Sequence, residues 1–229
     1  MSKTFLRICQ QVAEDAGIAG KLSSVTGQTG EFLRVVNWVK RANTEIDGLW
    51  FNWNYLHTTH AFITIKDVRD YPAPVDHNYW DIKTFKIPAL ETNLLSLSYT
   101  RHKVDPSTPV KNQPSIFTVL PSQSVRFIDI PDDAYGITAD YWRKSKELVN
   151  NDDEPRIPET FRDIIVYKAL SYYANYESAD EVKVQAIENY AKRLDQLQSR
   201  ELPDFKGSAN LQSGSDIQVS VPYDDFSDF

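Results

Sequence analysis

The sequence contains very little cysteine and no long hydrophobic run. Cys9 is the only cysteine among 229 residues, so no disulfide can form within the chain and a packed core must hold the fold. No apolar stretch approaches the roughly 18 residues of a membrane-spanning helix. The residues after Lys3 follow a helical period and not the apolar run of a signal peptide. We therefore expect a protein that is made in the cytoplasm and does not enter a membrane.

Basic residues are also scarce. Lys and Arg number 25 against 32 Asp and Glu, which gives a formal charge of −7. This balance argues against a protein that reads duplex DNA, because such a protein needs a basic face for the phosphates. The eight glycines and the hydrophobic content of 41% exclude a collagen and a largely disordered chain. The composition describes a globular chain of one domain, or of one domain with an insertion.

Helical periodicity dominates both ends of the chain. Apolar residues at steps of three and four predict a first helix over residues 5–16, with Thr4 as its N-cap and Gly17 as its end. The same stride predicts a second helix from about Thr29 to Trp53. Pro158 is placed to begin a third helix, and Ser178 with Glu181 predicts a capping box for a fourth. The predicted buried residues of the fourth helix are Val184, Ile187, Ala191 and Leu194, joined by Tyr190 and Leu197.

Between the helices the period changes to two, which is typical of strands. Ala61, Ile63 and Ile65 alternate with polar residues and predict the apolar face of a first strand. A hairpin is expected at Pro121, between two short apolar runs. In the last strand Ile137, Ala139 and Tyr141 should share one face. Further strand candidates lie at residues 82–87, 95–99, 115–120, 124–128 and 136–142.

These patterns predict an α+β fold. Two N-terminal and two C-terminal helices would form a four-helix bundle, with an inserted antiparallel β-sheet region and an extended C-terminal tail. The predicted boundaries place the bundle at residues 1–57 and 158–202, the β-rich insertion at 58–149, a linker at 150–157 and the tail at 203–229.

No residue pattern indicates a catalytic centre, a metal or a cofactor. The turn from Gly27 to Gly30 lacks the lysine of a phosphate-binding loop, so it is interpreted as a helix entry. His57, His60 and His77 would bind a metal only if folding brought them together. The cluster Trp50, Phe51, Trp53 and Tyr55 suits a wedge between the second helix and the sheet, and a platform for stacking bases is the alternative.

The C-terminal tail is acidic but not purely polar. Five Asp against Lys206 give residues 203–229 a net charge of −4. A tail that only solvates the chain has no need of apolar residues. An extended segment with alternating apolar residues can add a strand to a neighbouring sheet or place aromatic rings in a partner's groove. A tail that binds nothing is the alternative. The candidate partner-binding residues are Ile217, Val219, Val221, Tyr223, Phe226 and Phe229.

Several short motifs also occur in the order that is found in a known protein family. In the first half they are Glu14–Ile18, Gly27–Glu31 and Arg34–Val39, and downstream they are Ala139–Trp142, Asp153–Pro155 and Ile165–Tyr167. Over residues 4–203, and more weakly between 66 and 114, the sequence resembles the head-to-tail adaptor proteins, or connectors, of tailed bacteriophages. The tail is not part of this resemblance.

The resemblance implies a structural protein of the virion neck and not an enzyme. Such adaptors dock beneath the portal protein as a ring, here expected to hold twelve subunits, with the helices towards the portal and the sheet towards the nozzle or another tail protein. The ring would line the ejection channel, through which the genomic DNA passes without sequence-specific binding. The protein would therefore be found in the virion, and in the host cytoplasm during viral assembly. Another tail or neck subunit that binds proteins is the alternative, and a metal-assisted hydrolase is the third hypothesis.

Overall fold

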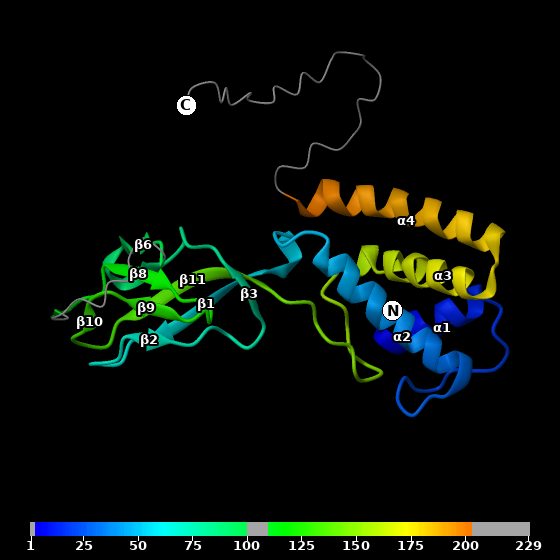
Figure 1. Ribbon diagram of the computed structural model, residues 1–229, viewed down its shortest axis with the longest axis horizontal. Coiled ribbons are helices and arrows are strands. Elements are labelled where there is room, and N and C mark those ends of the chain that lie inside the picture. The colour runs from blue at the N-terminus through cyan, green and yellow to red at the C-terminus, as the bar shows by residue number, and fades with distance from the viewer. Residues whose placement is uncertain (1–2, 100–109, 203–229) are drawn as a thin grey trace, which may run out of the picture.

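The computed structural model describes residues 3–99 and 110–202, so the candidate residues of the tail lie outside the described part. The molecule is elongated, with the helices at one end and the strands at the other (Figure 1). It is a mixed α+β protein, as predicted. Among the described residues, no helix is both long and apolar enough to span a membrane.

The first helix, α1 (Phe5–Asp15), follows the predicted range and ends before Gly17, whose φ of 70° suits a residue without a side chain. The hydroxyl of Thr4 does not cap it. Instead, the backbone amides of Phe5 and Leu6 donate to the carbonyl oxygens of Asp153 and Asn151 at 2.7 and 3.1 Å. The start of α1 is therefore completed by a segment that is distant in the sequence.

The second helix, α2 (Gly30–Gly48), ends earlier than the periodicity predicted. Trp50 and Phe51 lie in the turn that follows, and a short 3₁₀ helix, η1 (Asn54–Leu56), leads on to the sheet. Trp53 is fully buried, but it enters the core from this turn and not from the helix. Apolar residues continue at helical spacing as far as Trp53 because both the helix and the turn face the same core.

The C-terminal helices also depart from two predictions. Pro158 precedes a 3₁₀ turn, η3 (Glu159–Phe161), and α3 (Asp163–Glu177) begins only after it. Ser178 does not cap α4 (Asp180–Glu201). It adopts a left-handed conformation with φ of 57° and ends α3, while the amide of Ala179 donates to the carbonyl oxygen of Ala174 at 3.0 Å. The predicted capping box is therefore wrong, because the serine is used as a C-cap.

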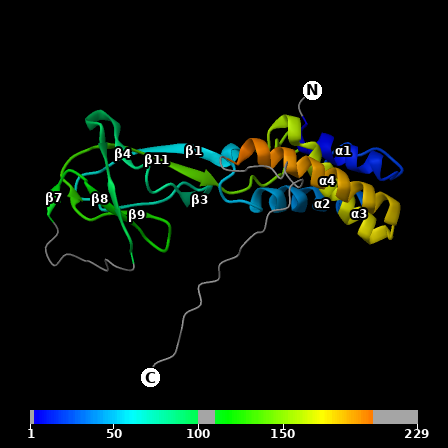
Figure 2. The ribbon, with the colours of Figure 1, turned by 90° about the horizontal axis from the view of Figure 1, so that it is seen from above.

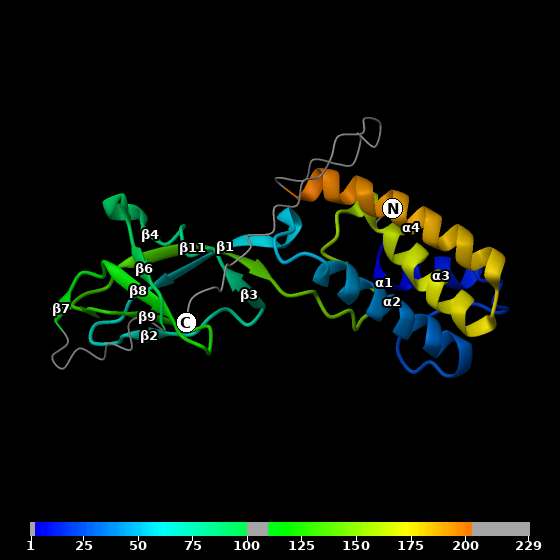
Figure 3. The ribbon, with the colours of Figure 1, turned by 45° about the horizontal axis from the view of Figure 1, so that its top comes forward.

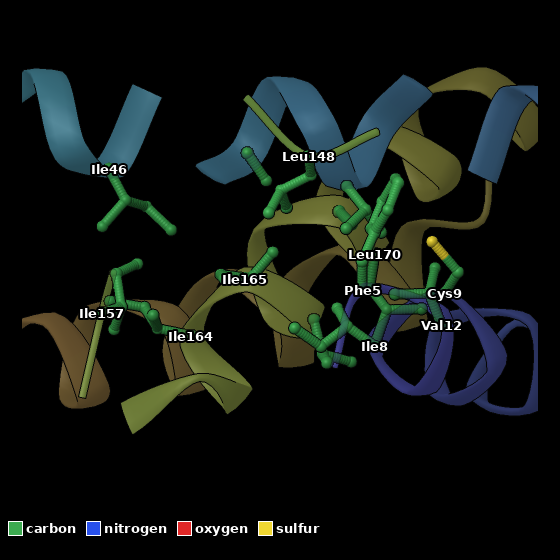
Figure 4. Close-up of a cluster of buried hydrophobic side chains, with 14 of the residues drawn as sticks. Phe5, Ile8, Cys9, Val12, Ile46, Leu148, Ile157, Ile164, Ile165 and Leu170 are labelled. Atoms are coloured by element: carbon green, nitrogen blue, oxygen red, sulfur yellow. The ribbon is translucent and has the colours of Figure 1, made fainter. Parts of the chain in front are cut away.

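The helical core is centred on α3, which packs against α1, α2 and α4. Figure 4 shows residues of α1 and α3 meeting in this core, with Leu148 and Ile157 from the connecting segment beside them. On α4, Leu197 is fully buried as predicted, whereas Val184 and Ile187 are 58% and 47% exposed. The predicted buried face of α4 is thus wrong for Val184, Ile187 and Ala191, which are all exposed, whereas Ala186 is buried.

The strands form two main sheets (Figure 3). In the first sheet β1 (His57–Ile63) and β11 (Gly136–Arg143) are antiparallel, and β3 (His77–Trp80), β4 (Lys86–Ile87) and β5 (Thr92–Asn93) continue it beyond β11. The second sheet has the order β2 (Asp70–Tyr71), β9 (Val125–Phe127), β8 (Ile116–Val119) and β6 (Leu95–Leu97). A small pair joins β7 (Lys111–Asn112) and β10 (Ile130–Pro131), and η2 (Pro88–Leu90) lies between β4 and β5. The β6–β8 and β7–β10 pairs are parallel, which the antiparallel prediction missed.

A second hydrophobic core lies among these strands. Ile137, Ala139 and Tyr141 of β11 face it as predicted. The rings of Phe85 and Phe117 stack in it with centroids 4.1 Å apart. The predicted hairpin is confirmed, since β8 and β9 pair antiparallel around residues 120–124.

The predicted face of β1 is inverted. Ile63 is 67% exposed and Ile65 is 62% exposed, whereas Phe62 packs against the core between the sheets. Aromatic rings therefore fill the inner face, and the isoleucines that suggested the apolar face lie on the outer one.

Candidate functional site

Two segments connect the helices with the first sheet. η1 leads into β1, and residues 144–157 return from β11 to the helical core. Arg143, at the end of β11, donates hydrogen bonds to the carbonyl oxygens of Tyr55 and Leu56 at 3.0 and 3.3 Å. Its guanidinium therefore ties the outgoing segment to the returning one.

A second tie involves Asp76, just before β3. Its carboxylate accepts hydrogen bonds from Arg156 at 2.9 Å and from the Tyr141 hydroxyl at 2.8 Å. Burial alone would raise the pKa of Asp76, but the bonds from Arg156 and Tyr141 outweigh it and hold the pKa below its usual range. The side chain of Arg156 is only 16% exposed, so this ion pair fixes the returning segment against the sheet.

A buried carboxyl group lies on the helical side of the same junction. Asp47, near the end of α2, accepts hydrogen bonds from Ser145 at 2.6 Å and from the Tyr55 hydroxyl at 3.0 Å. Burial raises the pKa of Asp47 to about 6, although these two bonds and the charge of Arg156 oppose the shift. The carboxyl group links α2 to both connecting segments.

The surface of the junction carries large aromatic side chains. We define the aromatic patch as Phe51, Tyr79 and Trp142. Phe51 is 54% exposed and Tyr79 is 49% exposed. The ring of Phe51 lies 5.2 Å from Tyr79 and 6.2 Å from Trp142, centroid to centroid. An exposed group of this kind typically marks a contact with another protein.

The predicted aromatic wedge is thus divided between two environments. Trp53 is buried and stacks on Tyr55 with centroids 5.4 Å apart, which is the predicted role at the helix–sheet boundary. Phe51 instead belongs to the exposed patch, and Trp50, its neighbour in the sequence, is exposed as well. Tyr79 and Trp142 could not be identified from the sequence, because the pairing of β3 with β11 brings them together and no local spacing connects them.

The three candidate histidines, His57, His60 and His77, do not form a metal site. His57 lies on the outer face of β1 beside Trp142, whereas His60 lies on the inner face, near Trp80. His77 is 3% exposed and packs against Trp80 with ring centroids 4.5 Å apart. Burial, with a smaller contribution from Lys144, lowers the pKa of His77 to about 4. Over residues 3–99 and 110–202, no group of three His, Cys, Asp or Glu side chains is placed to hold a metal ion.

The single cysteine lies in the helical core. Cys9 is fully buried, and burial raises the pKa of its thiol far above the usual range. It packs as a small apolar side chain among the core residues of α1.

A family model described as the SU10 adaptor protein matches residues 3–211, which is most of the chain. The chain belongs to the SU10 adaptor protein family. This match confirms the resemblance to phage head-to-tail adaptors and supports a structural role for the adaptor in a virion. A comparison with curated proteins found no match. The matched range ends before Ile217, so the candidate tail residues of this adaptor fall outside the family model.

Proposed function

We propose that this adaptor forms a closed ring between the portal and the nozzle or another tail protein. The helical end would contact the portal, and the strands would face the next tail component. The family match carries this proposal, and the shape supports it, because the helices and the strands present unlike surfaces at opposite ends of the molecule (Figure 1). A subunit that sits between two different partners needs two such surfaces.

The two hydrophobic cores support the proposed division of the chain. The helical core draws on residues 5–56 and 148–202, and the core of the strands draws on residues 71–141. We take residues 1–57 and 158–202 as a four-helix bundle, 58–149 as its β-rich insertion and 150–157 as the linker, with Leu148 and Ile157 packed against the bundle. The tail, residues 203–229, would bind a neighbouring protein in the neck through its alternating apolar and aromatic residues.

The charge of the chain suits a channel for DNA. With a net charge of −7, the adaptor would repel the phosphates of passing DNA and so keep them from adhering to the wall. We propose a ring of twelve subunits that lines this channel, without sequence-specific contacts and without catalysis. Assembly would take place in the host cytoplasm, and the adaptor would remain in the neck of the virion.

Native mass spectrometry of the purified adaptor, alone and after mixing with the portal ring of the same phage, tests this proposal. We expect a monomer alone and a portal that gains twelve copies of the adaptor. A portal that gains no adaptor would contradict the proposal and favour another tail or neck subunit. A portal ring from an unrelated phage serves as the control, because specific docking requires matching surfaces.

A further inference from the structure

The first sheet ends in an open edge at β1. In the described part of the chain β1 pairs only with β11, and it runs for seven residues from His57 to Ile63 (Figure 2). The opposite end of the sheet is β5, which has only two residues. β1 is therefore the long edge of this sheet.

The direction of the hydrogen bonds shows which backbone groups this edge offers. The amide of Thr64, directly after β1, donates to the carbonyl oxygen of Tyr135 at 2.9 Å. The backbone amides and carbonyl groups of the even-numbered residues of β1 therefore point towards β11. Pairing alternates along an antiparallel strand. The amides and carbonyl groups of Thr59, Ala61 and Ile63 therefore point away from the sheet.

The strand at this edge lacks charged residues, proline and a bulge. Native sheets commonly block an exposed edge with charged residues, proline or a bulge. β1 contains no Lys, Arg, Asp, Glu or proline, and its register with β11 is regular throughout. The side chains of Ala61 and Ile63 are exposed beside it. The edge is thus open both to backbone pairing and to apolar contact.

The same chain contains a segment that matches this edge. Residues 217–221 alternate Ile217, Val219 and Val221 with polar residues and carry no charge, and Pro222 then removes an amide that a longer strand would need. Strand pairing here would bring no like charges together. The apolar side chains of the segment would cover Ile63.

The chain that follows α4 starts near β1 and is long compared with this strand. Leu202, directly after α4, packs in the helical core. The negative charge of Glu201 contributes to the raised pKa of Tyr55, which lies close to the start of β1. Residues 203–216 can span up to ~50 Å when extended. The seven residues of β1 occupy only ~23 Å. The chain between α4 and the segment is therefore long enough for the segment to pass the full length of β1.

We propose that residues 217–221 of one copy add a strand to the β1 edge of the neighbouring copy in the ring. This inference rests on the proposed ring. The segment and the edge are different surfaces of one chain, so their pairing is head to tail, which is the type of contact that closes a ring. Pairing of two β1 edges would instead produce a two-fold dimer.

Cysteine crosslinking of the full-length adaptor on the portal tests the pairing. Ala61→Cys is combined with one tail substitution at a time, from Ile217→Cys through Val221→Cys, and the ring is oxidised and separated on a non-reducing gel. Neighbouring strands place Cβ atoms close enough for a disulfide only on a shared face. We expect a strong ladder of linked subunits at the one apolar position that lies opposite Ala61, which is Ile217, Val219 or Val221, with a yield several-fold above those for Gln218 and Ser220. Ala61→Cys alone is the control and should give no ladder, because Cys9 is buried.

Other crosslinking results would overturn the inference. Equal yields at all five positions would indicate a tail without strand pairing, and a linked monomer of altered mobility would show that the tail pairs with its own subunit. High yields only at Gln218 and Ser220 would contradict the proposed side-chain placement. A complete ring without crosslinks would overturn the strand addition and leave the adaptor function intact. If native mass spectrometry shows no ring on the portal, the proposed function fails and this inference fails with it.

A backbone substitution gives an independent test. Ala61→Pro removes an outward amide from the edge, whereas Ala61→Ser keeps it. We expect Ala61→Pro to lower the fraction of portals that carry a complete ring, and Ala61→Ser to leave that fraction unchanged. Circular dichroism checks that both variants are folded. Complete rings with folded Ala61→Pro would contradict the pairing.

Discussion

The indole Nε1 of Trp53 donates a hydrogen bond to the carbonyl oxygen of Ile46 at 3.2 Å. The same carbonyl accepts the amide of Leu49, also at 3.2 Å, so both of its lone pairs are used in the last turn of α2. Trp53 and Ile46 are both fully buried. Trp53 thus stabilises the end of the helix with its polar atom and fills the core with its ring.

Trp53→Phe should lower the free energy of unfolding by about 1–3 kcal/mol, because it removes a buried hydrogen bond and leaves unfilled space. Urea unfolding followed by circular dichroism measures this change. Trp50→Phe is the matched control, since Trp50 is 42% exposed and its substitution should stay within about 0.5 kcal/mol. Equal effects at the two positions would contradict the burial of Trp53.

Asp47 should make stability depend on pH. Its pKa in the folded state is raised to about 6, so its contribution to stability is present below the unfolded value, near 4, and is lost as pH rises through 6. Over this range the difference between the wild type and Asp47→Asn should change by up to roughly 3 kcal/mol, because only the wild type must bury a charge. Urea unfolding of both proteins at several pH values between 4 and 8 measures it. Parallel pH profiles would contradict the assignment.

The two Asp–Arg pairs of the sheet region should differ in their importance for stability. Asp76→Ala leaves Arg156 without its carboxylate partner in a mostly buried position, which should cost about 1–3 kcal/mol. Asp70→Ala breaks the pair with Arg126, in which the side chain of Asp70 is 46% exposed and that of Arg126 is 35% exposed. This substitution should lower the free energy of unfolding by less than about 1 kcal/mol. Thermal unfolding of the two variants compares them directly. A larger loss at Asp70 would contradict the role of Asp76 at the junction.

Deletion of residues 207–229 should leave a folded monomer, because Leu202 is the last described residue of the helical core. Assembly on the portal should weaken, since the deletion removes the candidate partner-binding residues. Circular dichroism tests the fold, and native mass spectrometry with the portal tests assembly. Unchanged ring formation by the truncated chain would exclude a role of the tail in assembly.

The sequence predicted elements best where one face of an element meets one core. The stride of α1 and the alternation of Ile137, Ala139 and Tyr141 both identified the buried face correctly. The same reasoning failed for Ile63 and Ile187, which are apolar but exposed. Periodicity shows that an element has an apolar face, but it does not show whether that face meets this chain or solvent.

Local signals also failed where a residue had two possible uses. Ser178 matched an N-cap in the sequence but ends the preceding helix in the structure. At the junction, the aromatic patch depends on the pairing of Tyr79 with Trp142, which no spacing along the chain reveals. The tail residues are a different case, because they lie outside the described residues and their role stays a prediction.

The start of α1 has a consequence for the order of folding during synthesis. Its first amides bond to Asn151 and Asp153, and Arg162 also donates to the carbonyl oxygen of Lys3 at 3.2 Å. These partners leave the ribosome long after α1 does, whereas the strands from β1 to β11 emerge as one continuous stretch. The core of the strands can therefore form on the ribosome while α1 and α2 still wait for α3. In the nascent chain, the helical end becomes complete last.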